Sequence, residues 1–238
     1  NKRKLIPVGL IFGETSIEEV CFRVFPEEEK RVNVGNFVLV PNYDIRYEDD
    51  RFVLARIVEI SRKNYLADES MVINIRSPDI LKRMIEKGYA VSELTELTLA
   101  KAVIMGRAVK YAEGKARFEK PKKPPRPFDL VYYADDEIVE EQLRLLRGTE
   151  KNYIEIGRLR GNPNVKAYLD VPRLITQHCA ILAATGGGKS WTAAVLAEQL
   201  ILNYDLSIII IDPHSEYSTL LVPAHFLREK EKEKAKNI

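Results

Sequence analysis

The chain has 238 residues, of which 45% are hydrophobic and 30% are charged, and its formal net charge is +2 at pH 7. This length and apolar content suffice for two domains with separate cores, and the near-balance of charge excludes the strong overall basic excess of a dedicated nucleic-acid binder. No apolar run approaches the roughly 20 residues of a membrane helix, so we expect no membrane partner.

The cysteines and the types of charged residue indicate the cellular compartment and the growth temperature of the source organism. The two cysteines, Cys21 and Cys179, lack metal-ligand spacing, so we expect reduced, buried thiols. The charged residues are dominated by Lys, Arg and Glu, a composition typical of thermophile proteins because surface ion-pair networks become more useful at high temperature. We therefore expect a cytoplasmic protein from a thermophile.

The N-terminal part predicts a series of short antiparallel strands. Runs rich in Val, Ile and Phe, such as 8–13, 34–40 and 54–60, are separated by Gly, Pro, Asn and Asp residues that favour turns. Closing such strands into a small barrel removes exposed sheet edges. Residues 99–110 return to strand character, and we expect an all-β small barrel domain over residues 1–150.

Two helices are expected within this first domain. Around the helix predicted over residues 78–88, Ser77 suits the N-cap, Pro78 the first position and Gly88 the end. Its apolar face is expected to pack in the core and consists of Ile80, Leu81, Met84 and Ile85. A second helix, from about Glu137 to Leu146, closes the domain or leads toward the next one.

Residues 120–127, Lys-Pro-Lys-Lys-Pro-Pro-Arg-Pro, form a basic, proline-rich strip. Proline removes backbone donors and favours an extended conformation, so the strip is predicted to be extended. It is either a contact for DNA phosphates or a stiff connector with solvated charges. We favour the connector, because phosphate contact requires the strip to face the nucleic acid.

The most informative stretch is residues 183–190, Ala-Ala-Thr-Gly-Gly-Gly-Lys-Ser. It follows a run at 178–182 that predicts a short buried strand, and it precedes a run at 191–201 that predicts a helix. Consecutive glycines let backbone N–H groups point at phosphate oxygens, reinforced by the helix N-terminus. The sequence therefore predicts an ATP site, with Ala183 standing where the Walker A pattern has glycine.

The order of residues in this loop assigns their roles. Lys189 is expected to place its ammonium on the β and γ phosphates, and the Ser190 hydroxyl to ligate Mg²⁺. The complete set of expected nucleotide-binding residues is Thr185, Gly186, Gly187, Gly188, Lys189, Ser190 and Trp191.

A second apolar run, residues 207–212, predicts a central parallel strand that ends at Asp212. Ligands of open α/β sheets bind at that edge, so Asp212 is expected to hold the Mg²⁺ shell and Glu216 to orient a water. With Lys189 they are the expected catalytic residues. The run also looks like a Walker B strand, but it follows the loop helix directly, whereas that strand usually arrives later in RecA-like ATPases.

Together, the phosphate loop and Ile-Asp-Pro-His-Ser-Glu-Tyr at 211–217 resemble the HerA family of DNA-translocating ATPases. The upstream strands look like the small barrel that this family shares with ATP synthase subunits. The family pattern usually has glycine where this chain has Ser215. The resemblance implies an α/β P-loop domain of RecA-like fold that begins over residues 151–222, followed by a charged tail over 223–238.

The resemblance further implies a homo-hexameric ring ATPase that moves along double-stranded DNA and works with a NurA-type nuclease at broken ends. Such a motor also needs a Walker B pair, a sensor strand and an arginine finger, and none is identified here. We therefore expect the ATPase domain to be incomplete in this chain. Two alternatives stay open: a non-catalytic, nucleotide-binding module that assembles the ring, and a transport ATPase of the FtsK or VirB4 kind.

Overall fold

The computed structural model describes residues 4–44, 51–64, 77–87, 96–111, 116–147, 152–204 and 206–217. The chain divides into two compact units. The barrel unit comprises Asn1–Gly148 with Leu159–Val165, and the loop unit, named for its glycine-rich loop, comprises Thr149–Arg158 with Lys166–Ile238. The backbone therefore passes between the units three times.

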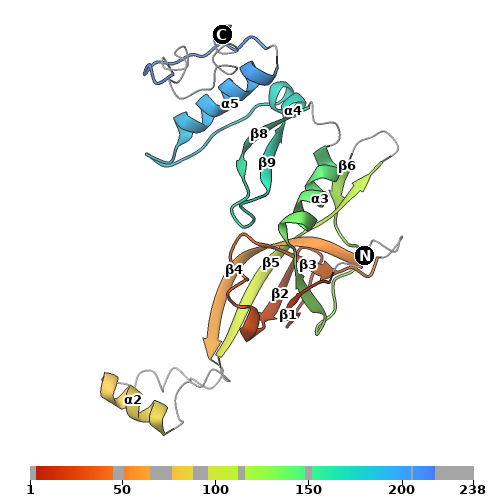
Figure 1. Cartoon of the computed structure of the whole chain (residues 1–238), viewed down its shortest axis with the longest axis vertical. Helices are drawn as coiled ribbons and strands as arrows, with labels where there is room; N and C mark the ends of the chain where they lie inside the picture. Colours follow the sequence, from red (N-terminus) through yellow and green to blue (C-terminus); the bar gives the residue numbers. More distant parts are fainter. Residues whose placement is uncertain are drawn as a thin grey trace. The chain divides into compact units, whose positions relative to one another are not determined.

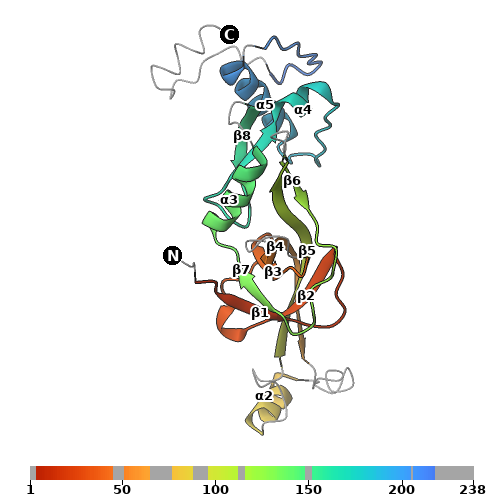
Figure 2. The ribbon, with the colours of Figure 1, turned by 90° about the vertical axis from the view of Figure 1, so that its right-hand side faces the viewer.

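Six antiparallel strands form the closed barrel of the first unit (Figures 1 and 2). They are β1 (Pro7–Ile11), β2 (Glu19–Val24), β3 (Phe37–Pro41), β4 (Phe52–Asn64), β5 (Glu96–Lys110) and β7 (Leu130–Tyr133). Their order is β2-β1-β7-β3-β4-β5, and pairing of β2 with β5 closes the ring. The predicted small barrel is confirmed, and β5 confirms the strand expected over 99–110, whereas β7 was not predicted.

The barrel encloses an apolar core because inward positions alternate along its strands. On β5 the buried residues include Ala100, Ala102 and Ile104, each at most 1% exposed. Larger side chains from the other strands fill the remaining space, among them Phe22 and Ile57. A β-bulge beside Ile57 breaks the register of β4 against β5, which lets these two long strands bend past the end of the barrel.

Two further elements lie along the chain in this part, the short 3₁₀ helix η1 (Pro26–Glu28) and the helix α2 (Pro78–Glu86). α2 confirms the helix predicted over 78–88, and the Ser77 hydroxyl accepts a hydrogen bond from the Ile80 N–H at 3.4 Å, as expected of an N-cap. Ile80 is 39% exposed. The side chains of Leu81, Met84 and Ile85 lie outside the described residues, so the core packing expected of that face stays a prediction.

A two-stranded ribbon and a helix cover one side of the barrel unit. β6 (Ala116–Glu119) pairs with the end of β5, and α3 (Asp136–Arg147) lies against both strands (Figure 2). α3 confirms the helix expected over 137–146. Gly106 has φ +107°, and a side chain there would overlap the Glu119 carbonyl, so a glycine is required where β6 crosses β5.

The segment Leu159–Val165 packs within the barrel unit, although the strands on either side of it belong to the loop unit. Val165 is 2% exposed and joins an apolar cluster with residues of α3, β3 and β4. Asn162 is fully buried, and its Nδ2 donates to the Asp136 carboxylate at 2.8 Å. The segment is thus held by both apolar and polar contacts.

A close backbone contact holds the same segment at a second point. Gly35 has φ +99°, and a Cβ placed on Gly161 would overlap the Gly35 carbonyl oxygen. Asn36 is 6% exposed; its Nδ2 donates to the Gly161 carbonyl, and its Oδ1 accepts the Asn33 N–H at 2.7 Å. The two glycines therefore permit an approach that side chains would prevent.

The loop unit contains an antiparallel hairpin and two helices (Figure 1). Its elements are β8 (Tyr153–Arg158), β9 (Lys166–Asp170), α4 (Val171–Thr176) and α5 (Lys189–Asn203). α4 lies against β9 and α5 against β8. α5 confirms the helix expected over 191–201, whereas the hairpin was not predicted from the sequence.

The two buried strands predicted at 178–182 and 207–212 are wrong: neither run forms a strand. Leu182 is 90% exposed, and Ile209 and Ile211 are each 91% exposed. A parallel strand needs neighbours for its backbone groups, and within the described residues no strand lies beside either run. Cys179 is accordingly exposed and not buried as expected, while Cys21 is half-buried, and both are free thiols.

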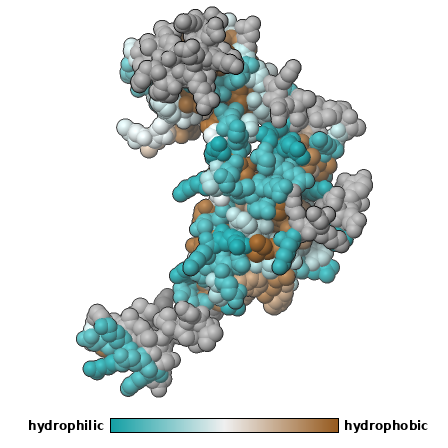
Figure 3. Space-filling model, in the orientation of Figure 1, coloured by the Kyte–Doolittle hydropathy of each residue, from teal (hydrophilic) through white to brown (hydrophobic). Residues whose placement is uncertain are grey.

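The surface of the barrel unit seen in Figure 3 is largely hydrophilic, with apolar residues in separate patches. The exposed apolar side chains of this unit include Phe12 and Phe128. Among the described helices, none is long and apolar enough to cross a membrane.

Candidate nucleotide site

The three glycines of the phosphate loop are required for two different reasons. Gly186 and Gly188 have φ of +78° and +79°, the left-handed region that favours glycine, and the space beside each is open. Gly187 is crowded instead, because a Cβ there would lie 2.9 Å from the Ala184 carbonyl oxygen and 3.0 Å from the Ala183 Cβ. Its own N–H donates to that carbonyl at 2.9 Å and closes the turn.

Ala183 replaces the first glycine of the Walker A pattern without strain. Within the described residues the non-glycine positions with positive φ are Phe128 and Ser215, so the alanine stays in the ordinary region. A negative φ is the condition for alanine to replace glycine here, so the loop keeps the backbone conformation expected for phosphate binding.

Directly after the loop, α5 begins at Lys189 without a side-chain cap. The N-cap residue is Gly188, which offers no side-chain acceptor, and the first N–H groups of a helix have no partner within it. The helix dipole adds partial positive charge at the same end. The Thr192 hydroxyl donates to the Gly188 carbonyl at 3.0 Å and so belongs to the helix. The loop and helix start therefore present backbone donors to an anion.

The structure brings Ser190 and Glu216 together. The Ser190 hydroxyl donates to the Glu216 carboxylate across 26 residues of sequence, a pairing that the sequence had not indicated. Lys189 is exposed beside them, and Trp191 is 77% exposed in the first turn of the helix. A carboxylate thus lies next to the hydroxyl that is expected to ligate Mg²⁺.

Asp212 begins the turn that carries Glu216. The Asp212 carboxylate accepts the backbone N–H of Tyr217 at 2.9 Å. This bond, supported by the N–H groups of Glu216 and His214, holds the pKa of Asp212 below its usual 3.8. Ser215 has φ +57°, a left-handed conformation that favours glycine.

The lowered pKa of Asp212 makes the turn sensitive to acid. Because the folded pKa is depressed, the stabilisation is present above the unfolded pKa near 3.8 and is lost as the pH falls through the lower folded value. We expect the Tyr217 amide proton to follow this titration by NMR, with a midpoint below 3.8. In Asp212→Asn the amide should no longer titrate, and a midpoint above 3.8 in the native chain would contradict the assigned bond.

The donor set fits Mg²⁺ only as part of a nucleotide complex. Within the described residues, no three His, Cys, Asp or Glu side chains come together as a metal site. Mg²⁺ bound with a nucleotide keeps several waters and takes one or two protein oxygens, the rest coming from phosphate. The Ser190 hydroxyl, which lies beside the Glu216 carboxylate, would supply one such oxygen.

Comparison with known proteins decides the family. Residues 154–238 match the family described as "Helicase HerA, central domain". The DNA double-strand break repair helicase HerA of Pyrococcus furiosus is 31% identical over 216 residues, which cover 91% of this chain and 35% of that protein. The chain belongs to the HerA family.

Other HerA proteins also match the chain. The DNA double-strand break repair helicase HerA of Sulfolobus acidocaldarius is 28% identical over 217 residues, covering 91% of this chain and 37% of that protein. A probable DNA double-strand break repair helicase HerA of Methanocaldococcus jannaschii is 40% identical over 99 residues, 42% of this chain and 18% of that protein. This HerA-family chain thus spans little more than a third of the Pyrococcus and Sulfolobus relatives.

Proposed function

We propose that this HerA-family chain binds ATP with Mg²⁺ at residues 183–190 and forms the nucleotide-binding part of an ATP-driven DNA helicase or translocase. The geometry of the loop carries the proposal: two glycines with positive φ and one crowded glycine precede an uncapped helix that starts with Lys189 and Ser190. The relatives named as DNA double-strand break repair helicases support it.

In this proposal each part of the loop has a separate task. The backbone N–H groups of the loop other than that of Gly187, together with the start of α5, cradle the phosphates, while the Lys189 ammonium binds the β and γ phosphates. The Ser190 hydroxyl ligates Mg²⁺, and the Trp191 ring flanks the bound nucleotide. When bound, Mg²⁺ neutralises charge that develops on the phosphate oxygens.

Hydrolysis requires a water placed in line with the γ phosphorus. Glu216 orients this water and accepts its proton as the new oxygen–phosphorus bond forms and the bond to the bridging oxygen of ADP breaks. Asp212 supports the reaction by fixing the turn on which Glu216 lies, through its bond to the Tyr217 N–H. It would also hold part of the Mg²⁺ shell through water. Lys189, Asp212 and Glu216 are therefore the proposed catalytic residues.

The proposed organisation extends to the assembly. Residues 1–150 form the barrel domain, 151–222 the start of a RecA-like ATPase domain and 223–238 a charged tail. We place the complete protein in a homo-hexameric ring on double-stranded DNA, with a NurA-type nuclease as partner. The relatives named as DNA double-strand break repair helicases support DNA as the ligand in this arrangement.

The decisive test is the ATPase rate of the full-length protein with and without double-stranded DNA. We expect DNA to stimulate turnover and Glu216→Gln to reduce it by roughly 10²- to 10⁴-fold, the usual contribution of a general base. Glu198→Gln, on α5, is the matched control and should retain the stimulated rate. Equal rates for the Glu216→Gln variant and the native protein would remove Glu216 from the mechanism.

One observation favours a second candidate, a nucleotide-binding module that assembles the ring without turnover. The Asp212 carboxylate is engaged by N–H groups of its own turn, so it is less available to a metal shell. A hexameric sample that binds ATP and shows no hydrolysis with or without DNA, even when supplied with the nuclease, would select this candidate over the motor.

A further inference from the structure

Positive charge is concentrated in one part of the barrel unit. Residues 101–127 contain nine lysines and arginines against two glutamates, in a chain whose formal net charge is +2. The remainder of the chain is therefore net acidic. Most of these residues lie on β5 from Lys101 onward, on β6 and on the proline-rich strip, residues 120–127, so the charge is concentrated in one continuous stretch of the chain.

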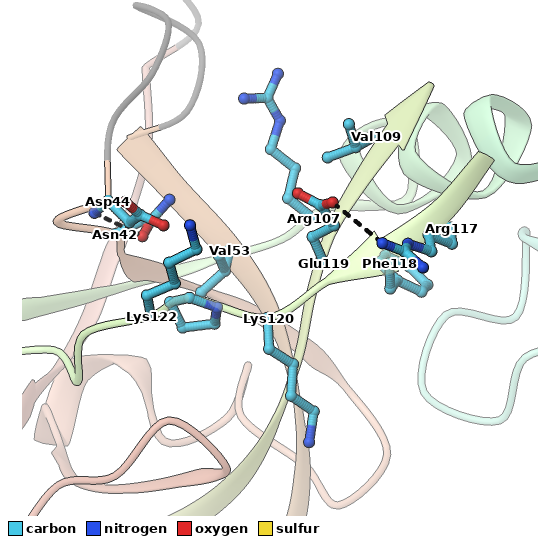
Figure 4. Close-up of a pocket in the computed structure, with 11 residues that line it drawn as sticks. Asn42, Asp44, Val53, Arg107, Val109, Arg117, Phe118, Glu119, Lys120 and Lys122 are labelled. Carbon is cyan, nitrogen blue, oxygen red and sulfur yellow. Dashed lines mark hydrogen bonds and ion pairs between the residues drawn. The ribbon is translucent and has the colours of Figure 1, made fainter. Parts of the chain in front are cut away.

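A pocket of about 410 Å³ lies among these elements. Basic side chains reach it from β5 (Arg107), from β6 (Arg117) and from the strip (Lys120 and Lys122), as Figure 4 shows. Two carboxylates also line it, from Asp44 and Glu119. The basic side chains outnumber the acidic ones, and all of the lining residues belong to the barrel unit, whereas the phosphate loop belongs to the other unit.

The strip is held against the barrel and is not a free connector. The Lys120 ammonium pairs with Glu18, and the Pro125 carbonyl accepts the Thr15 hydroxyl at 2.8 Å. At its far end, the Arg126 guanidinium lies 4.3 Å above the centre of the Tyr43 ring. Contacts near both ends therefore fix the extended path of the strip.

A further hydrogen bond secures the far end. The Tyr43 hydroxyl donates to the Asp129 carboxylate at 2.7 Å, and the Arg126 N–H donates to the same carboxylate at 2.8 Å. The bond to Asp129 raises the pKa of Tyr43, so the phenol stays protonated and the contact persists through neutral pH. The side chains of the strip are thus presented from a fixed backbone, which lowers the entropy lost when a ligand binds.

Between these fixed points, Lys122 and Lys123 are exposed, and neither has a carboxylate within ion-pairing distance among the residues that the structure describes. Two other basic side chains of the pocket do have partners, Lys120 with Glu18 and Arg117 with Glu119 at 3.7 Å. The positive charges of Lys122 and Lys123 are consequently available to an external anion.

The form of the surface matches a linear polyanion. An extended proline-rich chain rises about 3.1 Å per residue, so the four steps from Lys122 to Arg126 span roughly 12 Å. One strand of duplex DNA places a phosphate about every 3.4 Å along the helix axis, so roughly three or four phosphates lie along the same length. A pocket at one end of the strip accommodates one of them.

We propose that the pocket and the strip form a nucleic-acid site, separate from the nucleotide site, which binds the phosphodiester backbone through Lys122 and Lys123 and lies in the barrel unit. The inference rests on the proposed function insofar as DNA is the ligand named there. It assigns to the strip the role of a phosphate contact in place of the connector expected from the sequence. The contact is independent of base sequence, because lysines and phosphates carry no base information.

The test is binding of a fluorescein-labelled 25-base-pair duplex to the whole chain without nucleotide, by fluorescence anisotropy across a salt series. We expect Lys122→Glu with Lys123→Glu to weaken binding at least tenfold at low salt. The slope of log affinity against log salt should fall by about 2, since each lost phosphate contact removes about 0.9. The matched control, Lys82→Glu with Lys87→Glu, makes the same charge change at one exposed lysine of α2 and one directly after it, and should keep the native slope.

Several outcomes would overturn the inference. Equal loss in the two double variants would show a general charge effect, and no duplex binding by the native chain would remove the site. Displacement of the duplex by poly-glutamate of equal charge would show an acidic protein as the ligand. Binding of inorganic tripolyphosphate that depends on the two lysines, with duplex binding that does not, would show a site for free phosphates.

The same samples separate this inference from the proposed function. ATP binding, read from Trp191 fluorescence, should be unchanged in the Lys122 and Lys123 double variant, because the phosphate loop is in the other unit. Loss of duplex binding with ATP binding intact supports the inference by itself. Lack of ATP binding in the native chain, with lysine-dependent duplex binding, would remove the proposed function and leave the nucleic-acid site standing.

Discussion

Replacing Lys189 with alanine is expected to weaken ATP binding by roughly 10- to 100-fold. Hydrogen bonds to charged groups contribute about 1.5–3 kcal/mol, and the exposed ammonium has few contacts within the chain to lose. The measurement needs no label, because Trp191 is the single tryptophan of the chain and lies two positions after Lys189, 77% exposed. ATP should change its fluorescence in the native chain at concentrations that leave the variant unaffected.

The control for this variant is Lys87→Ala, which removes one exposed lysine at the end of α2. It should bind ATP with native affinity, and both variants should keep the native far-ultraviolet circular dichroism. If Lys189→Ala bound ATP as tightly as the native chain, the glycine-rich loop would be an ordinary turn before a helix and the nucleotide site would have to lie elsewhere.

Replacing Gly161 with alanine is expected to lower the free energy of unfolding of the barrel unit by about 3 kcal/mol, the upper end for overpacking. The added Cβ would overlap the carbonyl of Gly35 and approach the backbone of Asn36, and neither is the end of a flexible side chain. Relief of the overlap would also displace the Gly161 carbonyl, which accepts a hydrogen bond from the Asn36 amide. Urea denaturation followed by circular dichroism measures the change.

Gly13→Ala is the control for this substitution. Gly13 has φ +78° with no atom near its would-be Cβ, so alanine there should cost only the backbone strain of about 1–2 kcal/mol. A loss at Gly161 no greater than the loss at Gly13 would show that the segment 159–165 is not packed against Gly35.

Much of the barrel unit could be predicted from the sequence, because its signals are local. Alternating apolar residues and turn-forming Gly, Pro, Asn and Asp specify strands such as β3 and β4, and Ser77 with Pro78 specifies the start of α2. β7 was not predicted, because it has only four residues and begins shortly after the proline-rich strip. A run of four residues is too short to show an alternating pattern. The pairing of β2 with β5 joins residues about 80 positions apart, which no local pattern encodes.

The loop unit was less predictable, for two physical reasons. The sequence contains two features that predict the hairpin β8–β9 and that were not used. They are the alternating Ile-Glu-Ile at 154–156 and the turn-forming Asn-Pro-Asn at 162–164. The runs 178–182 and 207–212 carry strand composition, but a strand of a parallel sheet forms only beside its neighbours, so composition alone led to the wrong structure. The apolar content of these two runs shows that they are able to form buried strands, but it does not show that they form them in this chain.

The sequence predicts a role for each residue of the phosphate loop, and these roles stay predictions, whereas the contacts around the loop were not predicted. The motif assigns a role to each residue from Gly186 to Ser190, because each residue type meets a local requirement of the backbone or of the bound phosphate. The contact between Ser190 and Glu216 depends on a turn set by the left-handed Ser215, for which a serine gives little warning. Roles that depend on distant residues therefore stay proposals until measured.

The packing of Leu159–Val165 in the barrel unit determines how the protein can be divided. A fragment that stops at residue 150 would retain every strand of the barrel yet lack Val165 and Asn162, both buried in the intact unit. It would expose the apolar surface and the Asp136 carboxylate that these residues cover. Conversely, proteolytic cleavage at a single site between residues 148 and 152 would leave the two fragments associated. The C-terminal fragment would still carry Leu159–Val165, which packs in the barrel unit of the N-terminal fragment.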